Sequence, residues 1–235
     1  MTDIIDVNRS VIAACDVNDI EHHERVVRDT ADVKKIGGYK VGFSLALKYS
    51  LPKIVEVTRE YTDKPVIYDH QKAGTDIPYT GGNFAKVCSE AGVDAVILFP
   101  QAGPETQKQW IEAAQEENLG IIGGGLMTHP KYKRSEGGYL ADEALMEMYL
   151  KSAEKGVKNF VVPGNRPNDI KEIRKELKNN GGVNPVFYAP GFVAQGGEIA
   201  DATEAAGKKW HAIVGRAIYQ ADDIEKSAKE LTKDL

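Results

Sequence analysis

The chain has 235 residues, of which 42% are hydrophobic and 28% are charged. This length predicts one globular domain, residues 1–235, whose core is large enough to need no disulfide or structural metal. The net charge of −5, with both signs interspersed, argues against a nucleic-acid partner or a membrane surface. No apolar run reaches the roughly 20 residues of a membrane span. Cys15 and Cys88 lie in apolar settings without metal-ligand spacing, which indicates buried thiols and a cytoplasmic protein.

Eight apolar runs of strand length recur along the chain, and most are continuous rather than alternating. Continuous apolar strands are typical of a parallel sheet that is covered on both faces. The runs lie at residues 11–15, 39–43, 65–68, 93–99, 119–124, 157–162, 184–189 and 211–215.

Charged segments with helical spacing separate these runs. Residues 142–156 begin with acidic side chains, carry an apolar stripe and end at a glycine, and residues 165–182 repeat this design with Pro167 near the start. Eight strand–helix units in a chain of this length predict a single (β/α)8 TIM barrel. A doubly wound open sheet is the alternative, but the chain has no dinucleotide-binding fingerprint to favour it.

Ionised residues gather where the predicted strands end, although charge is costly beside a buried strand. Lys40 and Lys72 alternate with Asp16, Asp69 and Asp76, so each charge is stabilised by its neighbours. In a barrel these positions face one mouth, where the chemistry lies. An Asp beside a substrate carboxylate opposes that charge until CO2 leaves, and an adjacent lysine stabilises and protonates the carbanion. This scheme needs no metal and no organic cofactor.

The last two loops at the same mouth predict a phosphate site. Gly196-Gly197 and Gly215 allow close approach of the backbone, Arg216 supplies a permanent cation, and Gln195 offers a side-chain amide. Each loop taken alone has an ordinary explanation, since the glycines could simply form turns and Arg216 could simply be a surface residue. The occurrence of both features in the two loops that commonly bind phosphate in barrels favours a phosphorylated ligand.

The chain resembles the orotidine 5'-monophosphate (OMP) decarboxylase family over most of its length. The resemblance rests on motifs that occur in the family's order along the chain: Asp16, Lys40–Gly42, Asp76–Thr80, Met127–Pro130, Pro190–Gly197 and Ile213–Tyr219. It implies a homodimer of (β/α)8 barrels that converts OMP to UMP and CO2 without a cofactor.

The resemblance also implies catalytic roles, residue by residue. Asp16 and Lys40 would hold the ribose hydroxyls and orient the central lysine. Asp69 would lie against the substrate carboxylate, and Lys72 would donate the proton. Asp76 would reach into the partner's site and complete the charge array.

The implied substrate-binding residues surround this array. Ile77 and Thr80 would accompany Asp76 into the partner's site, and Thr128 would hydrogen-bond the pyrimidine amide. The phosphate would be held by Gln195, Arg216 and the backbone of Gly215, under a loop that begins at Pro190.

One motif departs from the family pattern. The usual signature is Asp-x-Lys-x-x-Asp, whereas Asp69, Lys72 and Asp76 are spaced one residue wider at each gap. Strand alternation points Lys72 away from Asp69, so we expect a bulge or turn that returns its amine to hydrogen-bond reach. His70 is interpreted as a neighbour that shapes this turn and not as the acid. Trp110 and Trp210 are interpreted as packing residues.

Two other functions remain open from the sequence. One is a Mg²⁺-dependent phosphosugar lyase or decarboxylase of the same superfamily, similar to hexulose-6-phosphate synthase. The other is a non-catalytic barrel that binds a nucleotide or phosphate.

Overall fold

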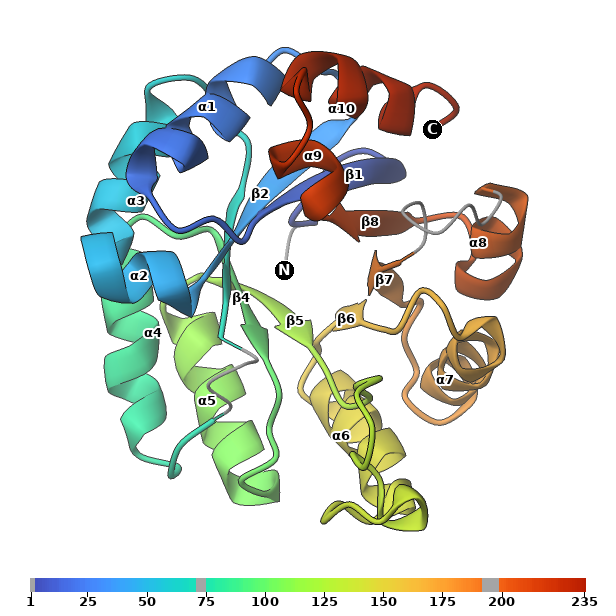
Figure 1. The fold of residues 1–235 in the computed structure, drawn as a ribbon. Coiled ribbons are helices and arrows are strands. Elements are labelled where there is room, and N and C mark those ends of the chain that lie inside the picture. The colour runs from blue at the N-terminus through green and yellow to red at the C-terminus, as the bar shows by residue number, and fades with distance from the viewer. Residues whose placement is uncertain (1–2, 71–74, 192–198) are drawn as a thin grey trace.

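The computed structural model describes the chain except for residues 1–2, 71–74 and 192–198. Its eight strands are parallel neighbours in chain order, and β1 also pairs with β8, so the sheet closes into a barrel. Figure 1 shows the strands around the centre and the helices outside them. The predicted (β/α)8 barrel is therefore confirmed, and the open doubly wound sheet is excluded.

All eight predicted strands form, with ends that differ by a few residues. They are β1 Arg9–Cys15, β2 Ile36–Gly42, β3 Val66–Asp69, β4 Ala95–Leu98, β5 Gly120–Gly123, β6 Asn159–Val161, β7 Val186–Pro190 and β8 Trp210–Val214.

The helices alternate with the strands. They are α1 Ile20–Thr30, α2 Phe43–Tyr49, α3 Leu51–Arg59, α4 Thr80–Glu90, α5 Pro104–Glu116, α6 Asp142–Glu154, α7 Pro167–Asn179, α8 Ile199–Ala206, α9 Arg216–Tyr219 and α10 Ile224–Thr232, with a 3-10 turn η1 at Arg134–Glu136. Helices α6 and α7 confirm the two helical segments predicted in detail. Among the described residues, none of the helices combines the length and the apolar character of a membrane span.

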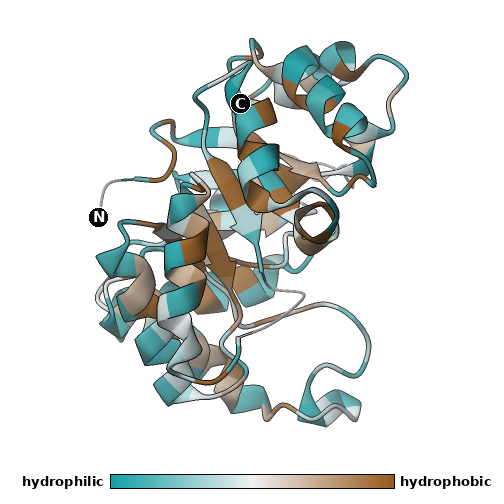
Figure 2. Cartoon of the chain, turned by 90° about the vertical axis from the view of Figure 1, so that its left-hand side faces the viewer, coloured by the Kyte–Doolittle hydropathy of each residue, from teal (hydrophilic) through white to brown (hydrophobic). Residues whose placement is uncertain are grey.

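The strands bury both faces, which explains their continuous apolar sequences. Along β1, Ile12 and Ala14 belong to the cluster inside the barrel, whereas Val11 and Ala13 belong to the cluster between the strands and the helices. Figure 2 shows hydrophobic strands enclosed by helices whose outer surfaces are largely hydrophilic. The two layers of apolar burial are the main stabilising contribution to this fold.

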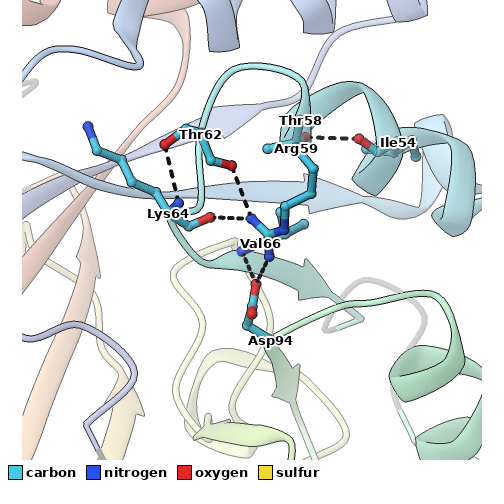
Figure 3. Close-up of polar contacts among 7 residues, drawn as sticks. All are labelled: Ile54, Thr58, Arg59, Thr62, Lys64, Val66 and Asp94. Atoms are coloured by element: carbon cyan, nitrogen blue, oxygen red, sulfur yellow. Dashed lines mark hydrogen bonds and ion pairs between the residues drawn. The ribbon is translucent and has the colours of Figure 1, made fainter.

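Polar contacts tie the chain together where β3 and β4 begin (Figure 3). The carboxylate of Asp94 accepts a hydrogen bond from the backbone N–H of Val66 at 2.6 Å and pairs with the Arg59 guanidinium at 2.7 Å. Arg59 also donates to the backbone carbonyl of Lys64 at 2.8 Å. One carboxylate thus fixes the end of α3, the following turn and the first residue of β3 against β4.

We predict that Asp94→Ala lowers the free energy of unfolding by about 1–2 kcal/mol, because it removes a partly exposed ion pair and leaves the Val66 N–H without its acceptor. Urea denaturation measures this loss. Glu56→Ala, which removes an exposed ion pair with Lys53 on α3, is the matched control and should change stability by less than about 0.5 kcal/mol. An equal loss in the two variants would contradict a special role for Asp94.

Candidate functional site

A charged cluster lies at the carboxyl ends of β1, β2 and β3. The ammonium of Lys40 donates to Asp69 Oδ2 at 2.7 Å and to Asp16 Oδ1 at 3.1 Å. The side chains of Lys40 and Asp69 are 4% and 1% exposed, whereas that of Asp16 is 36% exposed. The three residues come from neighbouring strands, so the register of the sheet brings them together. The structure thus joins three of the predicted site residues.

The charges in this cluster depend on one another. Burial alone would lower the pKa of Lys40, but the carboxylates of Asp69 and Asp16 outweigh burial and hold that pKa above its usual value. Lys40 is therefore a permanent ammonium at neutral pH. Because it touches both acids, it fixes the orientation of the Asp69 carboxylate at the mouth of the barrel.

Strand alternation continues past the end of β3. Asp69 points to the Lys40 cluster, whereas His70 lies on the opposite side of the chain, with its Nδ1 3.3 Å from the Tyr68 hydroxyl. Burial lowers the pKa of His70 and outweighs the charge of Asp69, which acts to raise it, so the imidazole is neutral at pH 7. Lys72 lies outside the described residues, and the predicted bulge that returns it to Asp69 stays a prediction.

The predicted partner-facing residues lie between β3 and the start of α4. Asp76 and Ile77 are exposed, and Thr80 is half-buried as the first residue of α4. Asp76 Oδ1 accepts the backbone N–H of Ile77 at 2.8 Å, and the Thr80 hydroxyl donates to the Ile77 carbonyl at 2.7 Å. This segment presents an anionic, partly apolar surface on the rim of the barrel.

A cavity of about 780 Å³ occupies the β4–β7 side of the same rim. Thr128 and Pro190, both predicted to contact substrate, are among its lining residues; the others include Phe99, Gln101, Met127, Tyr132, Val162 and Pro163. The cavity is mainly apolar with a few polar groups, the usual character of a site for a planar organic ligand. The charged cluster lies on β1–β3, and β3 pairs with β4, whose following residues Phe99 and Gln101 line the cavity.

The end of β8 presents the predicted anion-binding residues. Gly215 follows β8 directly, and Arg216 begins α9 with an exposed side chain. Gln195 falls in residues 192–198, outside the described residues.

Several features of this rim were not identified from the sequence. A Cβ on Gly124 would lie 2.2 Å from the Phe99 ring, so this glycine is what admits the phenylalanine that lines the cavity. Tyr132 donates to the Gly125 carbonyl at 2.6 Å and accepts from the Gln101 amide at 2.9 Å. The only sequence signal for this arrangement is the glycine run at residues 123–125.

Comparison with known proteins gives one consistent family. A family model described as "Orotidine 5'-phosphate decarboxylase / HUMPS family" matches residues 9–231. The orotidine 5'-phosphate decarboxylase of Methanosarcina acetivorans is 33% identical over 97% of this chain and 95% of its own length. That of Pyrococcus abyssi is 31% identical over 96% of this chain and 98% of its own length.

Solved structures agree with the sequence comparisons. The orotidine 5'-monophosphate decarboxylase of Methanocaldococcus jannaschii, complexed with the inhibitor BMP, superposes with a TM-score of 0.79 at 27% identity, covering 95% of this chain and 97% of that one. The orotidine 5'-phosphate decarboxylase of Pyrococcus horikoshii OT3 gives a TM-score of 0.76 at 28% identity, covering 94% and 97%.

We predict that Lys40→Met lowers the free energy of unfolding by about 3–5 kcal/mol, because it removes the ammonium that the buried carboxylate of Asp69 binds at 2.7 Å. Adding Asp69→Asn should recover part of the loss, and Lys53→Met on the exposed face of α3 should change stability little. Chemical denaturation measures all three.

The pH dependence of this contribution follows from the raised pKa of Lys40. The contribution is fully present below the ordinary lysine value of 10.5 and is lost as the pH rises through the higher folded-state pKa. On the alkaline side, the stability difference between wild type and Lys40→Met should therefore shrink only above pH 10.5. A difference that shrinks as the pH rises from neutral toward 10.5 would contradict this assignment.

Proposed function

This chain belongs to the orotidine 5'-phosphate decarboxylase family, and we propose that it converts OMP to UMP and CO2 by a metal-independent reaction in pyrimidine biosynthesis. The observation that carries the proposal is the buried ammonium of Lys40 between Asp69 and Asp16 at the barrel mouth. This ammonium holds the Asp69 carboxylate at the position where it would face the carboxylate of the substrate. The full-length relatives of the chain are decarboxylases.

The proposed reaction uses Asp69, the last residue of β3, and Lys72, which comes after it in the sequence. The negative charge of Asp69 repels the substrate carboxylate, and this repulsion disappears when the bond between the ring carbon and the carboxylate carbon breaks. The electron pair stays on the ring carbon, and CO2 leaves. The Lys72 ammonium stabilises the developing carbanion and transfers its proton to that carbon. Solvent then reprotonates the Lys72 amine.

Remote binding energy would hold the substrate against this charged end. The phosphate would be bound by Arg216, the backbone of Gly215 and Gln195, and the pyrimidine amide would contact Thr128. The exposed guanidinium of Arg216 and the position of Thr128 and Pro190 in the cavity wall support this arrangement. Binding contacts far from the reacting bond accelerate the reaction, because they hold the substrate carboxylate beside Asp69 despite the repulsion between the two negative charges.

Metal independence is supported by the charged cluster itself. A Mg²⁺ site requires several free carboxylate or carbonyl oxygens in octahedral geometry. In this cluster the Lys40 ammonium already binds one oxygen of Asp69 and one of Asp16. A cation that belongs to the chain thus already binds both acids.

A homodimer would complete the site, with Asp76, Ile77 and Thr80 contributed to the partner. Exposed apolar side chains support this part of the proposal, because most of those in the described residues lie on the elements that follow the adjacent strands β2 and β3. These are Phe43 and Leu47 on α2, Ile77 and Tyr79 before α4, and Val87 on α4, whereas Val7 and Tyr139 lie elsewhere. The free thiols of Cys15 and Cys88 are buried, as a protein of the reducing cytoplasm allows.

Two variants separate chemistry from binding. Lys72→Ala should lower kcat by at least about 10³-fold, because it removes the proton donor and the main stabilising charge, while UMP affinity changes little. Arg216→Ala should mainly weaken UMP, by roughly 10–100-fold, because it removes a charge-assisted contact with phosphate. Single-turnover kinetics and calorimetric titration with UMP measure the two effects, and equal loss of affinity in both variants would contradict this division.

A chelator distinguishes this reaction from that of a Mg²⁺-dependent phosphosugar enzyme. We expect the absorbance of OMP to decline at the same rate with and without EDTA, since no step uses a metal. Activity that disappears in EDTA and returns with Mg²⁺ would favour the phosphosugar reaction. Tight UMP binding without loss of OMP would indicate a non-catalytic barrel.

A further inference from the structure

The backbone of Ile77 links the predicted catalytic acid Asp76 to α5 through hydrogen bonds. Its N–H donates to Asp76 Oδ1 at 2.8 Å, and its carbonyl accepts the indole N–H of Trp110 at 3.1 Å. The hydroxyl of Thr80 donates to the same carbonyl at 2.7 Å. Ile77 and Asp76 are otherwise exposed, so these hydrogen bonds are what orients them.

The same indole reaches the other end of this segment. The ring of His70 lies 5.9 Å from that of Trp110, centroid to centroid, in a stacked orientation of 28°. Phe84 of α4 stacks on Trp110 at 4.7 Å and lies 4.6 Å from His70. A single side chain therefore contacts the residue after Asp69 and the residue after Asp76.

The position of Trp110 is itself fixed by packing. Its side chain is 3% exposed in the middle of α5. A Cβ on Gly81 would lie 2.8 Å from the indole Cδ1 and 3.0 Å from the Trp110 Cα. Glycine at this position lets α4 approach α5 closely enough for the indole N–H to meet the Ile77 carbonyl.

We propose that Trp110 is a positioning residue for decarboxylation: through the Ile77 carbonyl, with the His70 ring packed beside it, its indole sets how Asp76 is presented to the partner's site. The proposal rests on the function proposed above, in which Asp76 completes the site of the partner subunit. Trp110 lies on α5, packed against α4 behind this segment, so it acts on Asp76 through the backbone of Ile77. A small displacement of a positioned group changes the rate far more than substrate binding.

Trp110→Phe tests this directly, because phenylalanine retains the stacking with His70 and Phe84 but cannot donate to Ile77. Trp210→Phe is the matched control: Trp210 is also buried, and its indole N–H donates to the Thr203 hydroxyl at 3.2 Å, in β8 and away from this segment. We expect kcat for OMP to fall about tenfold or more in Trp110→Phe and less than about threefold in Trp210→Phe. The Kd for UMP should stay within about threefold of wild type in both variants.

A kcat that falls equally in the two variants, or a UMP affinity that weakens in parallel with kcat, would overturn the proposal and leave Trp110 a packing residue. Hydrogen exchange of the amides from Asp76 to Thr80 is a second readout that needs no activity. It should accelerate in Trp110→Phe only, and unchanged exchange would overturn the proposal. If wild type releases no CO2 from OMP, the proposed function fails, and hydrogen exchange alone decides whether Trp110 positions this segment.

Discussion

The buried ion pair between Lys40 and Asp69 constrains the rest of this structure. Neither charge is stable alone in a barrel interior, and the 2.7 Å contact between them neutralises both while holding the acid at the rim. The parallel register of β1, β2 and β3 supplies the geometry, since it aligns Asp16, Lys40 and Asp69 at one end of the sheet. The catalytic proposal depends on this fixed carboxylate.

The mouth of the barrel divides into sectors with different physical character. Charge is concentrated at β1–β3, an apolar cavity of about 780 Å³ opens at β4–β7, and Arg216 follows β8 with an exposed guanidinium. A ligand with an anionic group at one end, a planar ring and a carboxylate is complementary to such a rim. Its distant phosphate holds the carboxylate where the charge of Asp69 acts on it.

The order of the strands and helices was predictable from the sequence. A strand that is buried on both faces has a continuous apolar sequence, and a helix that is buried on one face has an amphipathic sequence. Asp16, Lys40 and Asp69 were predictable because charge beside a buried strand needs a partner. Thr128 and Pro190 in the cavity wall were predicted, but the rest of the wall was not, since the loop after β5 takes its shape from Tyr132 and Gly124 and not from a local periodicity. Trp110 was interpreted as packing; that it is buried is confirmed, but its hydrogen bond to Ile77 depends on tertiary contact between α4 and α5. Lys72 and Gln195 stay predictions.

The wider spacing of Asp69, Lys72 and Asp76 makes the direction of the Lys72 amine the central question. A crystal structure with UMP bound answers it most directly. We expect the Lys72 amine about 3–3.5 Å from the ring carbon that carries the carboxylate in OMP, and within hydrogen-bond distance of Asp69. An amine that points away from the pyrimidine, toward the helices or into solvent, would contradict the proposed role of Lys72.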